Sequence, residues 1–448
     1  MFPLHDRTRR RLCVAAFVAL CALPTAVVLL WGVSRHWPGR VAAEARRLSR
    51  ELGLDVSLDG MQNLRPGTVL YEGLEIADPE TGKPLLRCRM VEAQWTGLAD
   101  TEGRSKPSLL LIASQAEVQA GGLPRLWRLV RQPLQREGGP AQLDVRLRAS
   151  DLTLQADKRA ETLSDVQGSI ELLSGGAQAQ VDFRLAGVAA SKPARIRIVR
   201  NRQLSPPASG FELDTGGSAL PCGLLAMGVP ELEPLGPDAR FRGHVWFNEA
   251  AGGPTGAWEG EVTGQLTQVD LGRLVSDRFP HKLSGTAEVS IHKARFHRSR
   301  LEEAHCSLSA GPGVISRSLV EAAAAKLALA KGEMATTDLL LPYHQLSFAA
   351  EIDAGGLKIQ GICSGDEPAT ILCDARGPLL SDSPTQPSQP VVALLQTLVP
   401  ASEVQVPATR QTDWLIQHLP LPRVVPPPGS ETAAPYSRLR LGGAVEKK

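Results

Sequence analysis

The residue types that most often carry catalysis occur in this chain without the spacing that catalysis needs. Gly82 and Lys83 resemble the end of a phosphate-binding loop, but Pro84 stands where such a loop has a hydroxyl group. Ser290 and Lys293 match a nucleophile motif by letter, yet they lie in a segment of alternating apolar residues and no partner motif follows. The sequence therefore predicts neither a catalytic residue nor a bound cofactor.

The histidines and cysteines likewise lack the spacing of a metal site. His292, His297 and His305 are near in sequence, but intervals of five and eight residues do not specify a set of zinc ligands. The chain has no Cys-x-x-Cys and no His-Glu-x-x-His motif. We expect no metal site and no enzymatic activity, so an envelope hydrolase is the weakest functional hypothesis.

The composition excludes several other classes of protein. The 49 Lys and Arg residues balance 47 Asp and Glu residues, and the basic residues are spread along the chain, which gives no case for nucleic acid binding. Seven cysteines in 448 residues are too few for a disulfide scaffold. The 42 glycines and 34 prolines argue against an all-helical protein.

The strongest single signal is an apolar segment near the start. Residues 12–33 form a run of 22 without a charge, which as a helix would be roughly 33 Å long and would cross a bilayer core of about 30 Å. Trp31 and Trp37 stand at its far end, where indole rings favour the membrane interface. A cleaved signal peptide is the rival interpretation, but the run is long and has no clean cleavage site. We expect an uncleaved transmembrane anchor.

The charges beside this segment predict its orientation. Four arginines, Arg7 and 9–11, directly precede it, whereas the arginines on the far side are more widely spread. Long distal domains are translocated largely regardless of their charge. We expect a cytoplasmic tail over 1–11, a single pass over 12–33, and the bulk of the chain in the periplasm of a bacterium, held at the inner membrane.

The next segment, 34–53, is predicted to be a membrane-proximal helix. Residues 40–52 are good helix formers, and Gly53 is suited to the position that follows a helix. The arginines of this helix could touch anionic headgroups, or the helix could be a solvated stalk.

From residue 54 the apolar residues alternate with polar ones, which is typical of strands with one apolar face. The alternation is clear at 54–58, 143–148, 151–155, 194–198, 287–292 and 357–362. We expect a mainly β protein with a few helices, built on an antiparallel or meandering sheet over 54–376. The candidate lining of its apolar face comprises Val145, Leu147, Leu152, Leu154, Ile196, Ile198, Val289, Ile291, Leu357 and Ile359.

Two helices are expected to interrupt the strands. The first has an apolar stripe at helical spacing, and it either lies on a membrane surface or caps an edge of the sheet. This stripe consists of Leu123, Leu126, Trp127, Val130 and Leu134. The second helix is alanine-rich and spans 318–331. The segment 377–448 is rich in proline and serine and is expected to be a partly disordered tail with short docking helices at 391–399 and 414–419.

Two segments carry a resemblance to a known family. The stretch that follows the anchor, and within it Gly73-Leu-Glu-Ile-Ala-Asp-Pro-Glu-Thr-Gly82, resembles the N-terminal module of the AsmA-like family of bacterial envelope proteins, of the AsmA, TamB and YhdP type. Residues 336–365 resemble a late repeat of the same family. Together they cover about 80 residues, and neither is a catalytic motif.

The resemblance implies a fold and a function. The fold would be an elongated, curled sheet with an apolar inner face (an AsmA-like β-groove), and the function would be lipid transport or outer-membrane and envelope assembly. The partners would then be membrane lipids, bound by their acyl chains, together with other envelope proteins. The alternative is a structural or scaffolding envelope protein, with a packed β core and a proline-rich tail that binds partners. Alternating strands satisfy both hypotheses equally.

A last expectation concerns two cysteines. Cys363 and Cys373 flank a plausible hairpin turn, and facing cysteines in antiparallel strands can lie within the Cα separation of about 4.4–6.8 Å that a disulfide needs. They could pair in an oxidising periplasm, or remain as two free buried thiols.

Overall fold

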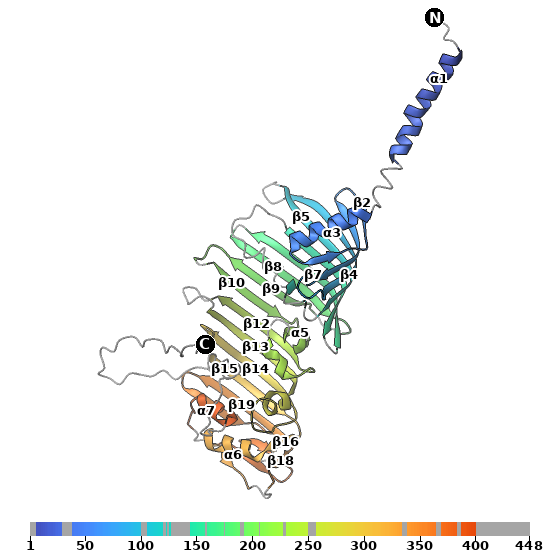
Figure 1. Ribbon diagram of the computed structural model, residues 1–448. Coiled ribbons are helices and arrows are strands. Elements are labelled where there is room, and N and C mark those ends of the chain that lie inside the picture. Colours follow the sequence, from blue (N-terminus) through green and yellow to red (C-terminus); the bar gives the residue numbers. More distant parts are fainter. Residues whose placement is uncertain are drawn as a thin grey trace, which may run out of the picture.

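The computed structural model contains one wide sheet, with helices on one side of it and a helical segment projecting from the N-terminal end (Figure 1). The described residues are 6–28, 38–99, 105–119, 122, 125–126, 144–156, 159–173, 175–188, 192–205, 207–226, 230–249, 257–333, 338–363, 369–382 and 387–399. The expectation of a mainly β protein is confirmed.

The first part of the sheet runs from β1 to β10, and the strands pair largely in the order of the chain. Short strands β1 and β2 both pair with β3, which forms the N-terminal edge. The bounds are β1 Asp55–Ser57, β2 Gly60–Arg65, β3 Thr68–Ala77, β4 Pro84–Ala99, β5 Ser105–Gln119, β6 Asp144–Ala156, β7 Arg159–Leu173, β8 Gly176–Leu185, β9 Ala194–Asn201 and β10 Ala208–Asp214.

The second part continues from β10 through β12, β13, β14 and β15 to β19, which pairs with both β20 and β21. Strand β22 pairs with β21 and β17, while β16 and β18 form a separate two-stranded antiparallel sheet. The bounds are β11 Leu220–Pro221, β12 Arg240–Glu249, β13 Trp258–Asp270, β14 Thr286–His297, β15 Arg300–Ala310, β16 Gly313–Ser316, β17 Ala330–Lys331, β18 Leu340–Tyr343, β19 Gln345–Asp353, β20 Gly356–Gly361, β21 Thr370–Cys373 and β22 Pro378–Ser381.

Among the described strands, one pair departs from antiparallel order. Strands β5 and β6 are parallel, with Leu111 opposite Leu147. Two parallel neighbours cannot be joined by a tight turn, because the chain must return to the starting edge. The 24 residues between Gln119 and Asp144 provide that return, and they include the predicted interfacial helix. The sheet is therefore mixed, although it is almost entirely a meander.

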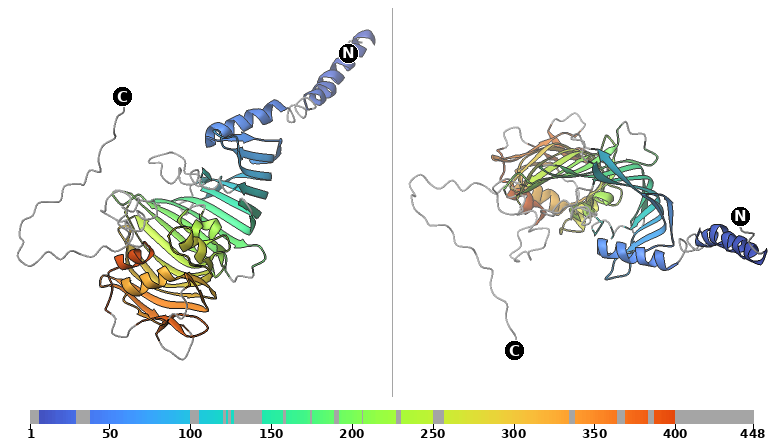
Figure 2. Two further views of the ribbon diagram at one scale, coloured as in Figure 1. Left: turned by 60° about the horizontal axis from the view of Figure 1, so that its bottom comes forward. Right: turned by 90° about the horizontal axis from the view of Figure 1, so that it is seen from above.

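The helices of the body lie on the same side of the sheet (Figure 2). Helix α3 packs at the N-terminal end, α5 near the middle, and α6 and α7 at the C-terminal end. The bounds are α3 Pro38–Leu52, α5 Cys222–Ala226, the 3₁₀ helix η3 Pro230–Leu235, the π-helical turn η4 Gly272–Ser276, α6 Arg317–Lys326 and α7 Val392–Leu398.

The structure contains a helix within the segment 34–53, and its proximity to a membrane stays a prediction. Helix α3 ends at Leu52, and Gly53 follows it with a φ of +67°, a left-handed conformation that favours glycine. The amide of Gly53 donates a hydrogen bond of 2.9 Å to the carbonyl of Ser49. Leu48 and Leu52 of this helix pack against the first strands, which fixes α3 on the apolar face of the sheet.

The N-terminal helical segment begins with α1 Asp6–Phe17 and η1 Val18–Ala22, and residues 23–28 continue it. Residues 29–33 of the expected anchor lie outside the described residues. Within the described ranges, no helix has both the length and the apolar character that crossing a bilayer requires.

Three expectations about the sheet and its helices need correction. The sheet is not strongly curled; helices packed on an apolar face bury it without the sheet having to close on itself. Residues 144–148 and 151–155 belong to one strand, β6, because a single irregularity separates the two alternating stretches. The alanine-rich helix ends at Lys326, since Ala328 has a φ of +53° and the next residues turn into β17.

The sheet also extends past the predicted domain boundary at residue 376. Strand β22 begins at Pro378, and α7 packs onto the same core through Ala393 and Leu394. The expected docking helix at 391–399 thus belongs to the folded body. The expected one at 414–419, with the rest of the tail from residue 400, lies outside the described residues.

Candidate functional site

The register of the strands brings apolar side chains into continuous rows on the helix-bearing face, here called the apolar face. One row, called the central row, crosses the sheet from β4 to β20. Its members are Ala93, Leu111, Leu147, Gly168, Val181, Ile196, Leu213, Val245, Val262, Ala294, Ala304, Ile352 and Leu357. No charged residue interrupts this row.

A second row, called the outer row, runs beside the first and contains most of the aromatic residues of this face. It consists of Trp95, Leu109, Val145, Ile170, Ala179, Ile198, Phe211, Phe247, Gly260, Phe296 and Leu301. Trp258 joins it: its ring lies 4.5 Å from that of Phe247 and 5.4 Å from that of Phe296, measured between centroids. The two rows together form a wide apolar surface.

The structure places all ten predicted lining residues on this face. Leu147, Ile196 and Leu357 belong to the central row, and Val145 and Ile198 to the outer row. Four others, Leu152, Leu154, Val289 and Ile359, pack against the hydrophobic cores of this face. Ile291 lies opposite Cys306, which packs against the same core. That these residues share a face follows from the strand pairing; that they line a lipid site stays a prediction.

Leu152 and Leu154 share a face with Val145 and Leu147, although a regular strand would place even-numbered and odd-numbered residues on opposite faces. Ser150 and Asp151 are both exposed, so two consecutive residues of β6 point away from the core and the alternation changes phase between them. The neighbouring strands carry the same irregularity, since Gln115 of β5 and Asp165 of β7 each have a φ of +51°. These aligned irregularities keep both halves of the strands apolar on one side.

The apolar face is covered unevenly. In the central row, Leu147 is 36 % exposed and Ile196 is half-buried, whereas Leu357 is only 3 % exposed. Leu357 is covered because its backbone pairs with that of Gln389, which leads into α7. In the outer row Trp95 is 51 % exposed. The N-terminal half of the face, over β4 to β9, is thus the part that can accept another molecule.

Polar groups border this open part. Arg200 and Glu249 form an ion pair of 2.9 Å at the side of the outer row, and Glu249 also accepts a hydrogen bond of 2.6 Å from the amide of Ser209. Further along, Tyr71 donates a hydrogen bond of 3.0 Å to Glu44 of α3. Burial, with the nearby Glu44 carboxylate, raises the pKa of Tyr71 to about 12, so it remains a neutral donor.

The predicted interfacial helix is described only in part. Leu126 is half-buried and packs against the core beneath the sheet, which agrees with the capping interpretation for this residue. The adjacent Arg125 forms ion pairs with Asp78, which is buried, and with Glu80 at 3.1 Å. The other residues of the stripe, Leu123, Trp127, Val130 and Leu134, lie outside the described residues.

Asp78 also organises the turn that resembles the AsmA-like motif. It accepts hydrogen bonds from the amide of Glu80 at 3.0 Å and from the hydroxyl of Thr81 at 2.6 Å, and Gly82 closes the turn with a φ of +65°. Lys83 follows as the chain enters β4. The segment is a structural turn between two strands.

Cys363 and Cys373 are both free, and they lie close together. Their Sγ atoms are 3.9 and 3.8 Å from the same carbonyl oxygen, that of Gln345. Burial raises the pKa of the Cys363 thiol to about 11, which leaves little of the reactive thiolate at neutral pH. The disulfide stays a prediction.

The histidines singled out in the sequence pair with carboxylates on the polar face. His297 lies 3.0 Å from Glu259, and His305 lies 3.0 Å from Glu303, whose pKa is lowered mainly by its hydrogen bond with Lys293. In the part of the chain that the structure describes, no group of three or more His, Cys, Asp or Glu residues is placed to hold a metal ion.

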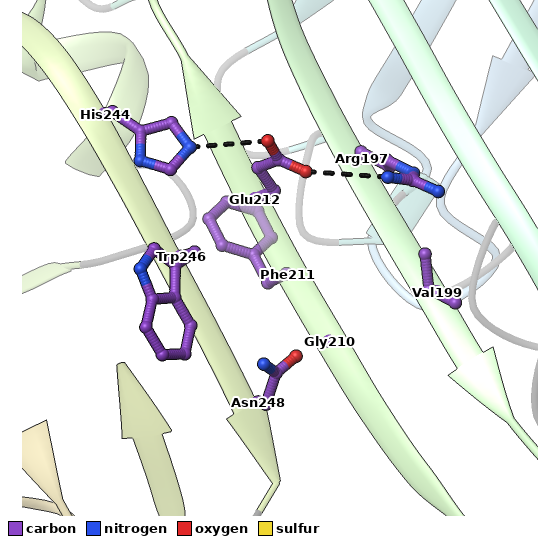
Figure 3. A pocket seen from close by; sticks show the side chains of 8 residues that line it. All are labelled: Arg197, Val199, Gly210, Phe211, Glu212, His244, Trp246 and Asn248. Carbon is purple, nitrogen blue, oxygen red and sulfur yellow. Dashed lines mark hydrogen bonds and ion pairs between the residues drawn. The ribbon is translucent and has the colours of Figure 1, made fainter. Parts of the chain in front are cut away.

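A hollow that no sequence pattern predicted lies on the polar face (Figure 3). Its volume is about 310 Å³, and its lining comes from β9, β10 and β12. The residues are Arg197, Val199, Gly210, Phe211, Glu212, His244, Trp246 and Asn248. Only the register of three strands brings them together, so no local spacing could have revealed the group.

The fold therefore defines a β-rich protein with one partly uncovered apolar face. Comparisons of the chain with protein-family models, with curated proteins and with solved structures found no match.

Proposed function

We propose that the open part of the apolar face binds the acyl chains of membrane lipids, and that the protein acts in lipid transport or envelope assembly without catalysis. The observation that carries this proposal is the continuity of the central and outer rows over β4 to β9, where every large side chain is half-buried or exposed and only the small Ala93 and Ala179 are buried. Scattered exposed apolar residues are ordinary on protein surfaces, but a contiguous apolar surface marks a binding site.

The physical chemistry of this face suits an acyl chain. Each methylene removed from water contributes about 0.8 kcal/mol, so a chain laid along several strands gains a large total from nonspecific contacts. The face offers small and branched side chains such as Ala179, Val181 and Ile196, with Phe211 beside them. Arg200 and Glu249 at the border can meet a polar headgroup that stays in water.

Location and partners belong to the same proposal. A membrane anchor over 12–33 would hold the sheet beside the bacterial inner membrane, with the N-terminus cytoplasmic and the body in the periplasm. Helix α3 joins that anchor to the N-terminal end of the apolar face, which is its open end. Lipids leaving the membrane would then meet the uncovered strands first, and other envelope proteins would receive them.

A scaffolding role is the second candidate, and one observation favours it. At the C-terminal end, α6 and α7 bury the apolar face into a conventional core that includes Val320 and Leu372, both fully buried. A sheet closed in this way over its whole length would have no lipid site, and the protein would act through its surface and its proline-rich tail.

Lipid analysis of the purified full-length protein separates the two candidates. We expect phospholipid to co-purify with the wild type and to be lost from Leu147→Asp and Ile198→Asp, which place a charge on the open rows while the protein stays folded. The matched control is Ser169→Asp, because Ser169 lies next to Ile170 on the opposite face. Mass spectrometry gives the lipid content and thermal unfolding reports the fold.

A wild type without lipid, together with Leu147→Asp and Ile198→Asp proteins that unfold, would overturn the lipid proposal in favour of a packed scaffold. Equal loss of lipid from the control and from the two row variants would also contradict it, since the effect would then not belong to the apolar face.

A further inference from the structure

The hollow on the polar face is built around a missing side chain. Gly210 of β10 lies between Val199 of β9 and Asn248 of β12 as their cross-strand partner. A Cβ at Gly210 would come within 2.4 Å of the Asn248 side-chain oxygen. A side chain at this position would therefore displace Asn248, and the glycine leaves the floor of the pocket without one (Figure 3).

A chain of charged and polar groups forms one wall. Glu212 lies 3.8 Å from the Nη1 atom of Arg197 and 3.3 Å from Nε2 of His244. Arg197 also donates a hydrogen bond of 3.0 Å to Gln178, while its Nε group is buried and, among the described residues, has no hydrogen-bond partner. Buried donors without a partner are rare, and this one belongs to a residue that lines the pocket.

The other wall is flat and apolar. Trp246 neighbours Glu212 across the strands, and its indole ring lies over β12 beside the polar groups (Figure 3). Asn248, two residues further on, offers both an amide donor and a carbonyl acceptor. The pocket thus combines one aromatic surface with several planar donors and acceptors.

We propose that this pocket binds one sugar residue of a neutral glycan. A pyranose has an apolar face of C–H groups, which packs on an aromatic ring, and a rim of hydroxyl groups, each a donor and an acceptor. Trp246 provides the ring, while Arg197, Glu212, His244 and Asn248 provide partners for the hydroxyl groups. The formal charges of Arg197 and Glu212 cancel, which suits a neutral ligand, and the Glu212 carboxylate repels a phosphate or carboxylate.

This inference is independent of lipid binding, because the two sites lie on opposite faces of the sheet. Isothermal titration of the full-length protein with N,N′-diacetylchitobiose, cellobiose and maltose tests it. We expect saturable binding of at least one disaccharide at about millimolar concentration, as is usual for a small ligand with few anchoring contacts. Trp246→Ala should weaken this binding at least tenfold.

A second variant tests the same proposal if the Trp246→Ala protein does not fold. Gly210→Val fills the floor of the pocket with a residue that favours strands, and it should abolish disaccharide binding while every lining side chain remains. The matched control is Leu339→Ala, which removes an exposed apolar side chain that belongs to neither site and should leave disaccharide affinity unchanged. Lipid content measured on the same samples shows whether the other face is intact.

Three outcomes would overturn the proposal. The first is a wild type that binds none of the three disaccharides. The second is binding that both Trp246→Ala and Gly210→Val leave unchanged. The third is displacement of the disaccharide by inorganic phosphate, since the pocket would then be an anion site centred on Arg197.

Discussion

The two ends of the apolar face follow one sequence pattern and reach different degrees of burial. At the C-terminal end, Ala304, Ile352 and Leu357 of the central row are buried, whereas Leu147, Val181 and Ile196 of the same row are half-buried or exposed. The cause lies in the connections. The chain inserts α6 and the two-stranded sheet of β16 and β18 between β15 and β19 and adds α7 after β22, but it joins the strands from β6 to β10 by short links.

The alternation of apolar and polar residues determines which side of a strand is apolar. Whether that side is buried in a core depends on the connections between the strands. An uncovered apolar face must either bind another molecule or remain in water at a cost in free energy. The following substitutions test whether the two ends differ as the structure indicates.

The largest effect is expected from a charge placed at each end of the central row. Leu357→Asp buries a carboxylate without a partner and should lower the free energy of unfolding by about 4 kcal/mol or more. Leu147→Asp leaves the carboxylate in contact with water and should change it by no more than about 1 kcal/mol. Urea unfolding of both variants gives the comparison, and equal losses would mean that the N-terminal end is also closed.

A smaller effect should follow from trimming the covering elements. Leu319→Ala in α6 creates a cavity in the closed core and should cost about 2–4 kcal/mol. Leu126→Ala, at the half-buried contact beside the parallel pair, should cost about 1 kcal/mol. The same unfolding measurement applies. A larger loss for Leu126→Ala would show that the open end depends on its cover more than its burial indicates.

The ion pair between Arg125 and Asp78 connects the segment between β5 and β6 to the turn that follows β3. Arg125→Ala leaves the buried Asp78 carboxylate with its two hydrogen bonds but without a counter-charge, which should cost about 1–3 kcal/mol. The control is Arg87→Ala, because its 2.9 Å pair with Glu75 is exposed and should contribute about 0–1 kcal/mol. Thermal unfolding compares the two variants, and similar losses would contradict a special role for Asp78.

The smallest effect concerns pH at the closed end. His281 is buried and lies 2.9 Å from Ser318 of α6. Burial lowers its pKa below the ordinary value, although the backbone of Thr397 in α7 opposes this shift. The unfolded chain therefore binds more protons, so the stability contributed by His281 is complete above about pH 6.5 and is lost as the pH falls through the lowered pKa.

Urea midpoints at pH 7.5 and pH 5.0 measure this linkage. We expect His281→Gln to lose less stability between the two values than the wild type does, whereas the exposed His292→Gln should behave like the wild type. If all three proteins lose equal stability, the acid sensitivity arises from other groups.

Part of this fold follows directly from the sequence. Alternation at 194–198, 287–292 and 357–362 identifies β9, β14 and β20, and the helix formers before Gly53 identify α3. These features depend on local periodicity and backbone conformation. Between Leu147 and Leu152 the apolar positions change from odd to even residue numbers, which is also visible in the sequence. This change is compatible with two strands or with one irregular strand, and only the pairing with β5 distinguishes them.

What the sequence could not supply is register. The parallel pairing of β5 with β6 depends on the path of a long connection, and β15 pairs with β19 although α6 and the two-stranded sheet of β16 and β18 lie between them in the chain. The polar pocket shows the same limit, because Arg197, Glu212 and Trp246 come from three strands whose relative shift is a tertiary property. A one-residue slip would have turned each of them onto the other face.

The parallel pairing of β5 with β6, here called the seam, also affects the order in which the strands assemble during folding. Every hairpin in the meander closes between neighbours in the chain, so each can form as soon as its second strand exists. The seam must instead wait for a loop of 24 residues to close, and that loss of chain entropy comes before any contact compensates it. Strands β1 to β5 and the strands from β6 onward are therefore expected to form separately, and their joining at the seam should be one of the slow steps of folding, together with the pairing of β15 with β19.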